Sequence, residues 1–112
     1  MSECLFCNIV DGSIPSDKVW EGEDAIAFRD INPKAPTHVV VVPKKHIASI
    51  ADIQKHDEPL MGSLMYSVSE VARTLDLTQG YKIIINVGTH GGQVIDHLHI
   101  HILGGKKIRT LV

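Results

Sequence analysis

Three histidines alternate with apolar residues in the run HLHIHIL at residues 97–103. Side chains on a β-strand alternate between its two faces, so His97, His99 and His101 would project to one side and their apolar neighbours to the other. Adjacent histidines would lie about 6.6 Å apart at Cα, near enough to share one substrate. Because neutral imidazole is a nitrogen nucleophile and a metal ligand, the run predicts a strand that carries chemistry. An exposed polar face is the weaker alternative.

A second group of possible ligands opens the chain. Cys4 and Cys7 are the only cysteines among 112 residues and form a C-x-x-C pair. Two thiolates at this spacing can occupy two corners of a tetrahedral metal site, and histidines are their natural complement. Two small buried residues or a redox pair are the alternatives. The redox pair is less favoured because the cysteines do not follow a strand.

The elements that must position these residues can be predicted from their periodicity. Strand-like runs occupy residues 18–21, 25–29, 37–42, 81–87 and 97–103, a short helix is expected at 5–10, and a glycine-rich turn is expected at 88–92. Between Asp57, an expected N-cap, and Gly80, apolar residues recur at helical spacing: Leu60, Leu64, Val68, Val71 and Leu75. The pattern predicts an α+β fold with a five-stranded, mainly antiparallel sheet and one long helix.

The composition is typical of a folded globular chain, with 44% hydrophobic and 21% charged residues. A net charge of -2 gives no bulk attraction to nucleic acid. No apolar run approaches the roughly 20 residues of a membrane helix, and the first residues do not resemble a targeting signal. We expect a single domain over residues 1–112, located in the cytoplasm, with neither a nucleic-acid nor a membrane partner.

The histidine run resembles the histidine-triad (HIT) motif, in which three histidines alternate with apolar residues and two apolar residues follow. The segment AFRDINPKAPTHVVVVPKKHI at residues 27–47 looks like the nucleotide-binding half of the same family. Asn86, the GGQ at 91–93 and the glycines at 104–105 also stand where the family has them. The resemblance covers residues 4–105 and is closest to zinc-bearing, bacterial-type members of the HINT branch, the histidine triad nucleotide-binding proteins.

The resemblance implies catalytic roles for His99, His101 and Gln93. His99 matches the family's nucleophile, which attacks an α-phosphate and forms a transient nucleotidyl-histidine. Its other ring N–H would be donated to the carbonyl of His97, which fixes the tautomer. His101 would contact phosphate oxygens and assist the leaving group, and Gln93 would lie near the bridging or leaving-group oxygen.

The resemblance also implies a nucleotide-binding set. Asp30 would accept from the ribose hydroxyls, with Phe28 and Ile31 beside the base or ribose. Asn86 and the backbone from Gly92 to Val94 would lie near the phosphate or leaving group. The implied ligand is a purine nucleotide, AMP or GMP or a conjugate of them, held by Phe28, Asp30, Ile31, Asn86, Gly92, Gln93, Val94, His99 and His101.

A structural zinc ion is implied in the same way. In zinc-bearing members, the C-x-x-C pair is completed by the histidine of the PKKH segment and by the first triad histidine. The implied metal ligands are Cys4, Cys7, His46 and His97, with Asp96 as a possible partner of His97. The family also forms twofold dimers through the long helix and the 81–87 strand, so a homodimer is expected.

Three functions fit these features. The first is an adenosine 5′-phosphoramidase that releases AMP, a hydrolase of purine nucleotide conjugates. A dinucleoside polyphosphate hydrolase and a low-turnover, zinc-bearing binding module are the alternatives. Val94 stands where many members have Ser, and the tail after His101 is short, so the leaving group stays open. His38, His56 and His90 are assigned no chemistry.

Overall fold

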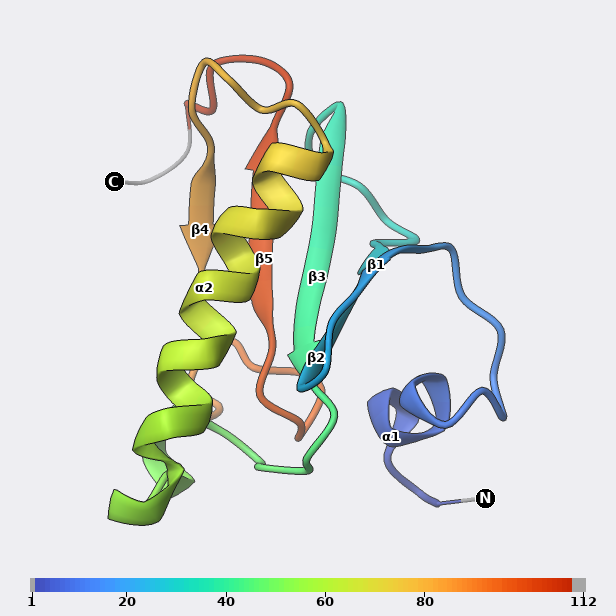
Figure 1. Ribbon diagram of the computed structural model, residues 1–112, viewed down its shortest axis with the longest axis vertical. Helices are drawn as coiled ribbons and strands as arrows, with labels where there is room; N and C mark the ends of the chain where they lie inside the picture. The colour runs from blue at the N-terminus through green and yellow to red at the C-terminus, as the bar shows by residue number, and fades with distance from the viewer. Residues whose placement is uncertain (1, 110–112) are drawn as a thin grey trace.

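The computed structural model describes residues 2–109, which form an antiparallel five-stranded sheet with helices on both sides (Figure 1). The sheet order is β1-β2-β3-β5-β4. These features confirm the predicted α+β fold with one long and one short helix. The elements follow in chain order: α1 (Leu5–Val10), β1 (Lys18–Glu21), β2 (Ala25–Arg29), β3 (Thr37–Pro43), two short 3-10 turns (Ile50–Asp52 and Lys55–Asp57), α2 (Glu58–Thr74), β4 (Lys82–Ile84) and β5 (Ile100–Gly104).

The sheet carries a separate apolar cluster on each face because its central strands are apolar on both sides. On β3, Val39 and Val41 belong to the cluster under α2, whereas Val40 and Val42 belong to the opposite cluster with Phe6 of α1. In Figure 1, α2 lies in front of β4 and β5, and α1 lies away from it, beyond β1 and β2. The side of the sheet away from α2 is therefore only partly covered.

α2 begins and ends close to the predicted positions, but its N-terminus is stabilised differently. Asp57 stands at the N-cap without a capping bond to the helix. Its carboxylate instead accepts from the backbone N–H of Gln54 at 2.9 Å and from Lys45 Nζ at 2.8 Å. Among residues 2–109, no helix is both long enough and apolar enough to span a bilayer.

The last two strands are shorter than predicted. The predicted strand 97–103 begins only at Ile100 and extends to Gly104, and the predicted strand 81–87 is reduced to Lys82–Ile84. The residues before β5 bond instead to the segment after β3: the N–H of Leu98 donates to the carbonyl of Ile47 at 2.7 Å. Within the described part of the chain β4 pairs with β5 alone, so it ends where that partner turns away.

Candidate active site and metal centre

Strand register brings two histidines together on the face away from α2. His101 on β5 pairs with Val40 on β3, and His38 lies two residues before Val40. Cross-strand partners share a face, as do residues two apart, so His38 and His101 lie diagonally on one face. On β5 the predicted alternation holds, because Ile100 and Ile102 pack in the cluster under α2.

His99 lies just before β5 and is buried, with 6% of its surface exposed. Its Nδ1 is 2.7 Å from the carbonyl oxygen of His97. A carbonyl only accepts, so Nδ1 carries the proton and Nε2 is left with a lone pair. The resulting tautomer is the one that a nucleophilic histidine needs.

His38 is a part of the site that we did not predict. The backbone N–H of Lys34 donates to His38 Nδ1 at 3.0 Å, so the neutral ring carries its proton on Nε2. That nitrogen lies 2.9 Å from Nδ1 of His101 and 3.4 Å from Oδ2 of Asp30. His38 thus donates to His101, which in turn carries its own proton on Nε2. A buried histidine in a valine-rich strand needs a polar partner, and that need was the available signal.

Burial keeps both of these rings neutral. It lowers the pKa of His38, with Asp30 opposing the shift. Burial, followed by the neighbouring rings of His99 and His38, lowers the pKa of His101 to about 4, again against Asp30. At neutral pH His101 therefore acts as a neutral hydrogen-bond donor through Nε2.

The depressed pKa of His101 makes stability depend on pH. The unfolded chain takes up this proton near pH 6.5 and the folded chain only near pH 4, so the unfolding free energy should fall as the pH drops between these values. We expect the urea midpoint to decrease from pH 6.5 to pH 4 and His101→Gln to flatten that decrease. An unchanged pH dependence in the variant would contradict the assignment.

A second cluster joins the start of α1 to the segment that follows β3 and to the segment that precedes β5. The ligand atoms of Cys4, Cys7, His46 and His97 all lie within 4.8 Å of one another. The two histidine Nδ1 atoms are 3.2 Å apart, and Nδ1 of His97 is 3.3 and 3.5 Å from the two sulfurs. A tetrahedral ion with ordinary ligand bonds would separate two nitrogens by about 3.3 Å and a nitrogen from a sulfur by about 3.6 Å. The cluster therefore fits a metal ion.

The hydrogen bond behind His97 supports the same conclusion. Its Nε2 donates to the carbonyl of Pro43 at 2.9 Å, so the partner of this nitrogen is a backbone carbonyl and not Asp96. The bond leaves the Nδ1 lone pair facing the cysteines, as a metal-binding histidine requires. Burial and then the adjacent Cys4 raise the pKa of the Cys7 thiol to about 11, so a cation would be needed to hold Cys7 as a thiolate.

A second group of possible ligands, Asp30, His38 and His101, does not present the histidine lone pair that a metal ion needs. Its ligand atoms also lie within 4.8 Å of one another. However, His38 Nδ1 accepts a hydrogen bond from Lys34, so its proton occupies the nitrogen that would face the ion. Metal binding would require the opposite tautomer and the loss of that bond. The group is better described as a hydrogen-bonded relay than as a metal site.

The glycine-rich turn at residues 88–92 is held by two of the predicted site residues. Asn86 Nδ2 donates to the carbonyl of Gly91 at 2.8 Å. Gln93 accepts from the N–H of Gly88 at 3.0 Å and donates to the carbonyls of Ala48 and Ile95 at 2.7 and 2.9 Å. In this conformation the Gln93 amide shapes the turn, and contact with a leaving group would require one of these bonds to be exchanged.

The remaining predicted residues differ in exposure. Phe28 on β2 is buried and meets Phe6 at 5.4 Å in a T-shaped contact. Ile31 and Val94 are 92% and 86% exposed, so both offer apolar surface to solvent. Gly92 has a φ of 80°, a backbone conformation that favours glycine. The structure thus brings Phe28, Asp30 and the histidines into one chain of contacts and ties Asn86, Gly92 and Gln93 to the turn.

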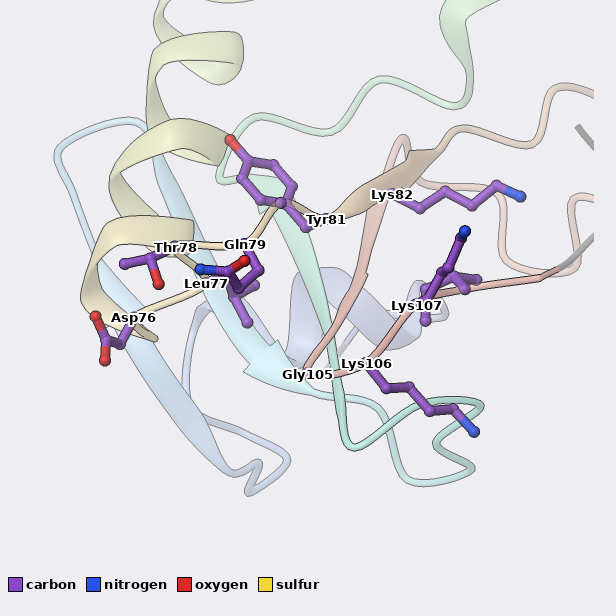
Figure 2. A pocket seen from close by; sticks show the side chains of 11 residues that line it. Asp76, Leu77, Thr78, Gln79, Tyr81, Lys82, Gly105, Lys106 and Lys107 are labelled. Carbon is purple, nitrogen blue, oxygen red and sulfur yellow. The ribbon is translucent and has the colours of Figure 1, made fainter.

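A cavity of about 720 Å³ lies away from the histidines. It is formed by the connection from α2 to β4 and by the residues after β5 (Figure 2). Tyr81 and the lysines Lys82, Lys106 and Lys107 line it, and no histidine, cysteine or glycine-turn residue does. The residues capable of catalysis therefore lie on the partly covered face of the sheet and not in this cavity.

Comparison with known proteins gives a consistent result. The family model of the HIT domain matches residues 11–108. Protein HitA of Neisseria gonorrhoeae is 44% identical over 104 residues, which cover 93% of this chain and 97% of that protein. A histidine triad protein from Clostridium difficile matches at a TM-score of 0.94 with 40% identity, covering 100% of this chain and 98% of that one. A HIT family hydrolase from Legionella pneumophila matches at 0.90 with 42% identity, covering 94% and 95%.

Proposed function

Because this chain belongs to the HIT domain family, we propose that it is a HINT-branch hydrolase of purine nucleotide conjugates, acting as an adenosine 5′-phosphoramidase that releases AMP. The observation that carries the proposal is the bond from His99 Nδ1 to the His97 carbonyl, which leaves a nucleophilic lone pair on Nε2. The solved relatives include a protein described as a HIT family hydrolase, which supports hydrolysis over binding alone.

In the proposed reaction, His99 Nε2 forms a bond to the α-phosphorus while the bond from phosphorus to the leaving nitrogen breaks. His101, neutral and protonated on Nε2, donates a hydrogen bond to the departing nitrogen, which takes up a proton from solvent. A water molecule then attacks the nucleotidyl-histidine, which releases AMP and restores the His99 lone pair. The protons balance because the attacking water releases one proton to solvent, which replaces the proton that the departing nitrogen took up, so each turnover consumes one water molecule and releases the amine and AMP.

Nucleotide recognition would use the residues that surround His99 and His101. Asp30 Oδ1 accepts from the N–H of Asn32 at 2.8 Å, and the carboxylate keeps further lone pairs for ribose hydroxyls. Phe28 and Ile31 would flank the base or ribose. The N–H groups of the turn from Gly92 to Val94 would bind phosphate oxygens. Val94 offers no side-chain hydroxyl, so the leaving group would receive only backbone donors there.

We also assign zinc to the cluster of Cys4, Cys7, His46 and His97. A set of two thiolates and two imidazoles is typical of closed structural zinc sites. When bound, the ion would supply a fixed anchor for α1 and for the carbonyl of His97, without itself touching the substrate. A cytoplasmic location would suit this role because a reducing environment keeps cysteines available as ligands.

The deciding experiment compares two substrates under the same conditions. Adenosine 5′-phosphoramidate and diadenosine tetraphosphate both place an adenylate on the nucleophile but differ in the leaving group. Preferential release of AMP from the phosphoramidate would support the proposal. Preference for the polyphosphate would favour the dinucleoside polyphosphate hydrolase. AMP binding by calorimetry without turnover of either compound would indicate the low-turnover binding module.

We further propose a homodimer formed through α2 and the edge strand β4. Among residues 2–109, β4 has a partner strand on one side only. On these elements or next to them, Met65, Tyr66, Tyr81 and Ile83 expose apolar surface, at 41 to 63%. Unpaired strand edges with apolar side chains favour association. Light scattering at micromolar concentration should give twice the chain mass, and Ile83→Lys should give one chain mass. A monomeric wild-type protein would overturn the dimer.

A further inference from the structure

In the sequence Phe6 stands between Cys4 and Cys7 of the metal cluster, and its ring contacts the proposed nucleophile, His99. The ring centroids of Phe6 and His99 are 5.2 Å apart with the planes at 83°, a T-shaped contact of the kind that stabilises aromatic pairs. Phe6 is buried and makes similar contacts with His97 at 6.0 Å and Phe28 at 5.4 Å. One side chain of α1 thus touches a metal ligand, the nucleophile and the expected nucleotide surface.

The orientation of His99 depends on contacts of this kind. Its Nδ1 is bonded to the His97 carbonyl, but an imidazole held at one nitrogen can still tilt about that bond and swing Nε2. The rings of Phe6 and His101 both meet His99 nearly at right angles, at 83° and 75°. These two rings therefore limit the tilt that the hydrogen bond allows.

The position of Phe6 depends in turn on α1, which is a weak element by itself. The helix has six residues, far fewer than the roughly 12 that an isolated helix needs to persist in water. The sulfurs of Cys4, the N-cap of the helix, and of Cys7 in its first turn both lie within 3.5 Å of His97 Nδ1. A metal ion held by Cys4 and Cys7 would therefore fix this helix to the segment that carries His97 and His99.

We propose that Phe6 is a positioning residue that couples occupancy of the metal cluster to the orientation of the His99 ring. The metal would act on the nucleophile through this packed aromatic ring, in addition to anchoring the His97 carbonyl that is bonded to His99. The effect on turnover rests on the proposed function. The structural coupling does not, because the state of the His99 ring can be measured without substrate.

The test replaces the ring while keeping an apolar side chain. In the zinc-loaded protein, Phe6→Leu should lower kcat for adenosine 5′-phosphoramidate about tenfold and change KM less than about threefold. In long-range proton–nitrogen NMR spectra, His99 should lose its single Nδ1–H tautomer signature. The matched control is Ile26→Ala, a buried residue of the same apolar cluster, which should lower stability but keep the wild-type kcat and His99 signals.

Removal of the metal gives a second, independent arm that does not depend on a variant folding. Chelation of the wild-type protein should change the His99 signals as Phe6→Leu does, and zinc should restore them only where Phe6 is present. Unchanged His99 signals after chelation, or wild-type signals and kcat in Phe6→Leu, would overturn the proposal. A wild-type protein that is inactive, but whose His99 signals respond in both arms, would refute the proposed function and support the coupling.

Discussion

Replacing His99 with alanine is expected to lower kcat for adenosine 5′-phosphoramidate by at least about 10⁴-fold, because it removes the nitrogen that forms the covalent intermediate. His101 is poorly suited to take its place. Its Nδ1 lone pair accepts from His38, and its Nε2 carries the proton. Steady-state release of AMP gives the measurement, and circular dichroism gives the check that the variant is folded.

The matched control is His90→Ala, the same exchange at an exposed histidine of the glycine-rich turn, which should keep wild-type activity. Because the bond from phosphorus to an imidazole nitrogen is labile in acid, reactions are quenched in alkaline denaturant, and mass spectrometry should detect a nucleotidylated chain in the wild type and none in His99→Ala. If His99→Ala stays within tenfold of the wild-type kcat, the nucleophile is another group, or water attacks directly.

The second large effect is expected on stability, when one of the two cysteine ligands is removed. Cys7→Ser should reduce bound zinc from about one ion per chain to nearly none. It should also lower the thermal midpoint by about 15 °C, because several kcal/mol of metal binding energy contribute to folding. Cys7 supports the cluster from α1, where its sulfur lies 3.4 Å from Nδ1 of His46. Elemental analysis and thermal unfolding measure the two effects.

Two histidine substitutions distinguish the loss of a metal ligand from the general effect of replacing an exposed histidine. His46 and His90 are both exposed, but only His46 belongs to the cluster. His46→Ala should therefore lose zinc and stability, whereas His90→Ala should lose neither. Full zinc content in both Cys7→Ser and His46→Ala would remove the proposed ligand set.

Much of the fold could be predicted because local patterns and tertiary packing agree. The β-branched run at residues 37–42 and the helical spacing of Leu64, Val68 and Val71 each match the observed core. The stretch before Ile100 could not be predicted in the same way. Its alternating residues read as a strand, but their hydrogen bonds go to Pro43 and Ile47. Only the path of a distant segment decides that pairing.

The candidate site shows the same limit. Cys4 and Cys7 could be named from their type and spacing, and His46 and His97 from the family resemblance, and the structure gathers the four in one place. The roles of Phe6 and His38 could not be named in advance. An apolar residue in a short helix and a histidine at a strand start have common structural explanations, and their contacts with His99 and His101 arise only when three segments meet.

The main-chain donor of Lys34 gives the relay an unusual tolerance to mutation. The proton position on His38, and through it on His101, is dictated by a peptide N–H and not by the lysine side chain. Nineteen of the twenty standard amino acids supply the same N–H, and proline alone lacks it. A substitution at this position can therefore change the charge that helps to lower the pKa of His38, while the tautomer of the neutral ring stays the same.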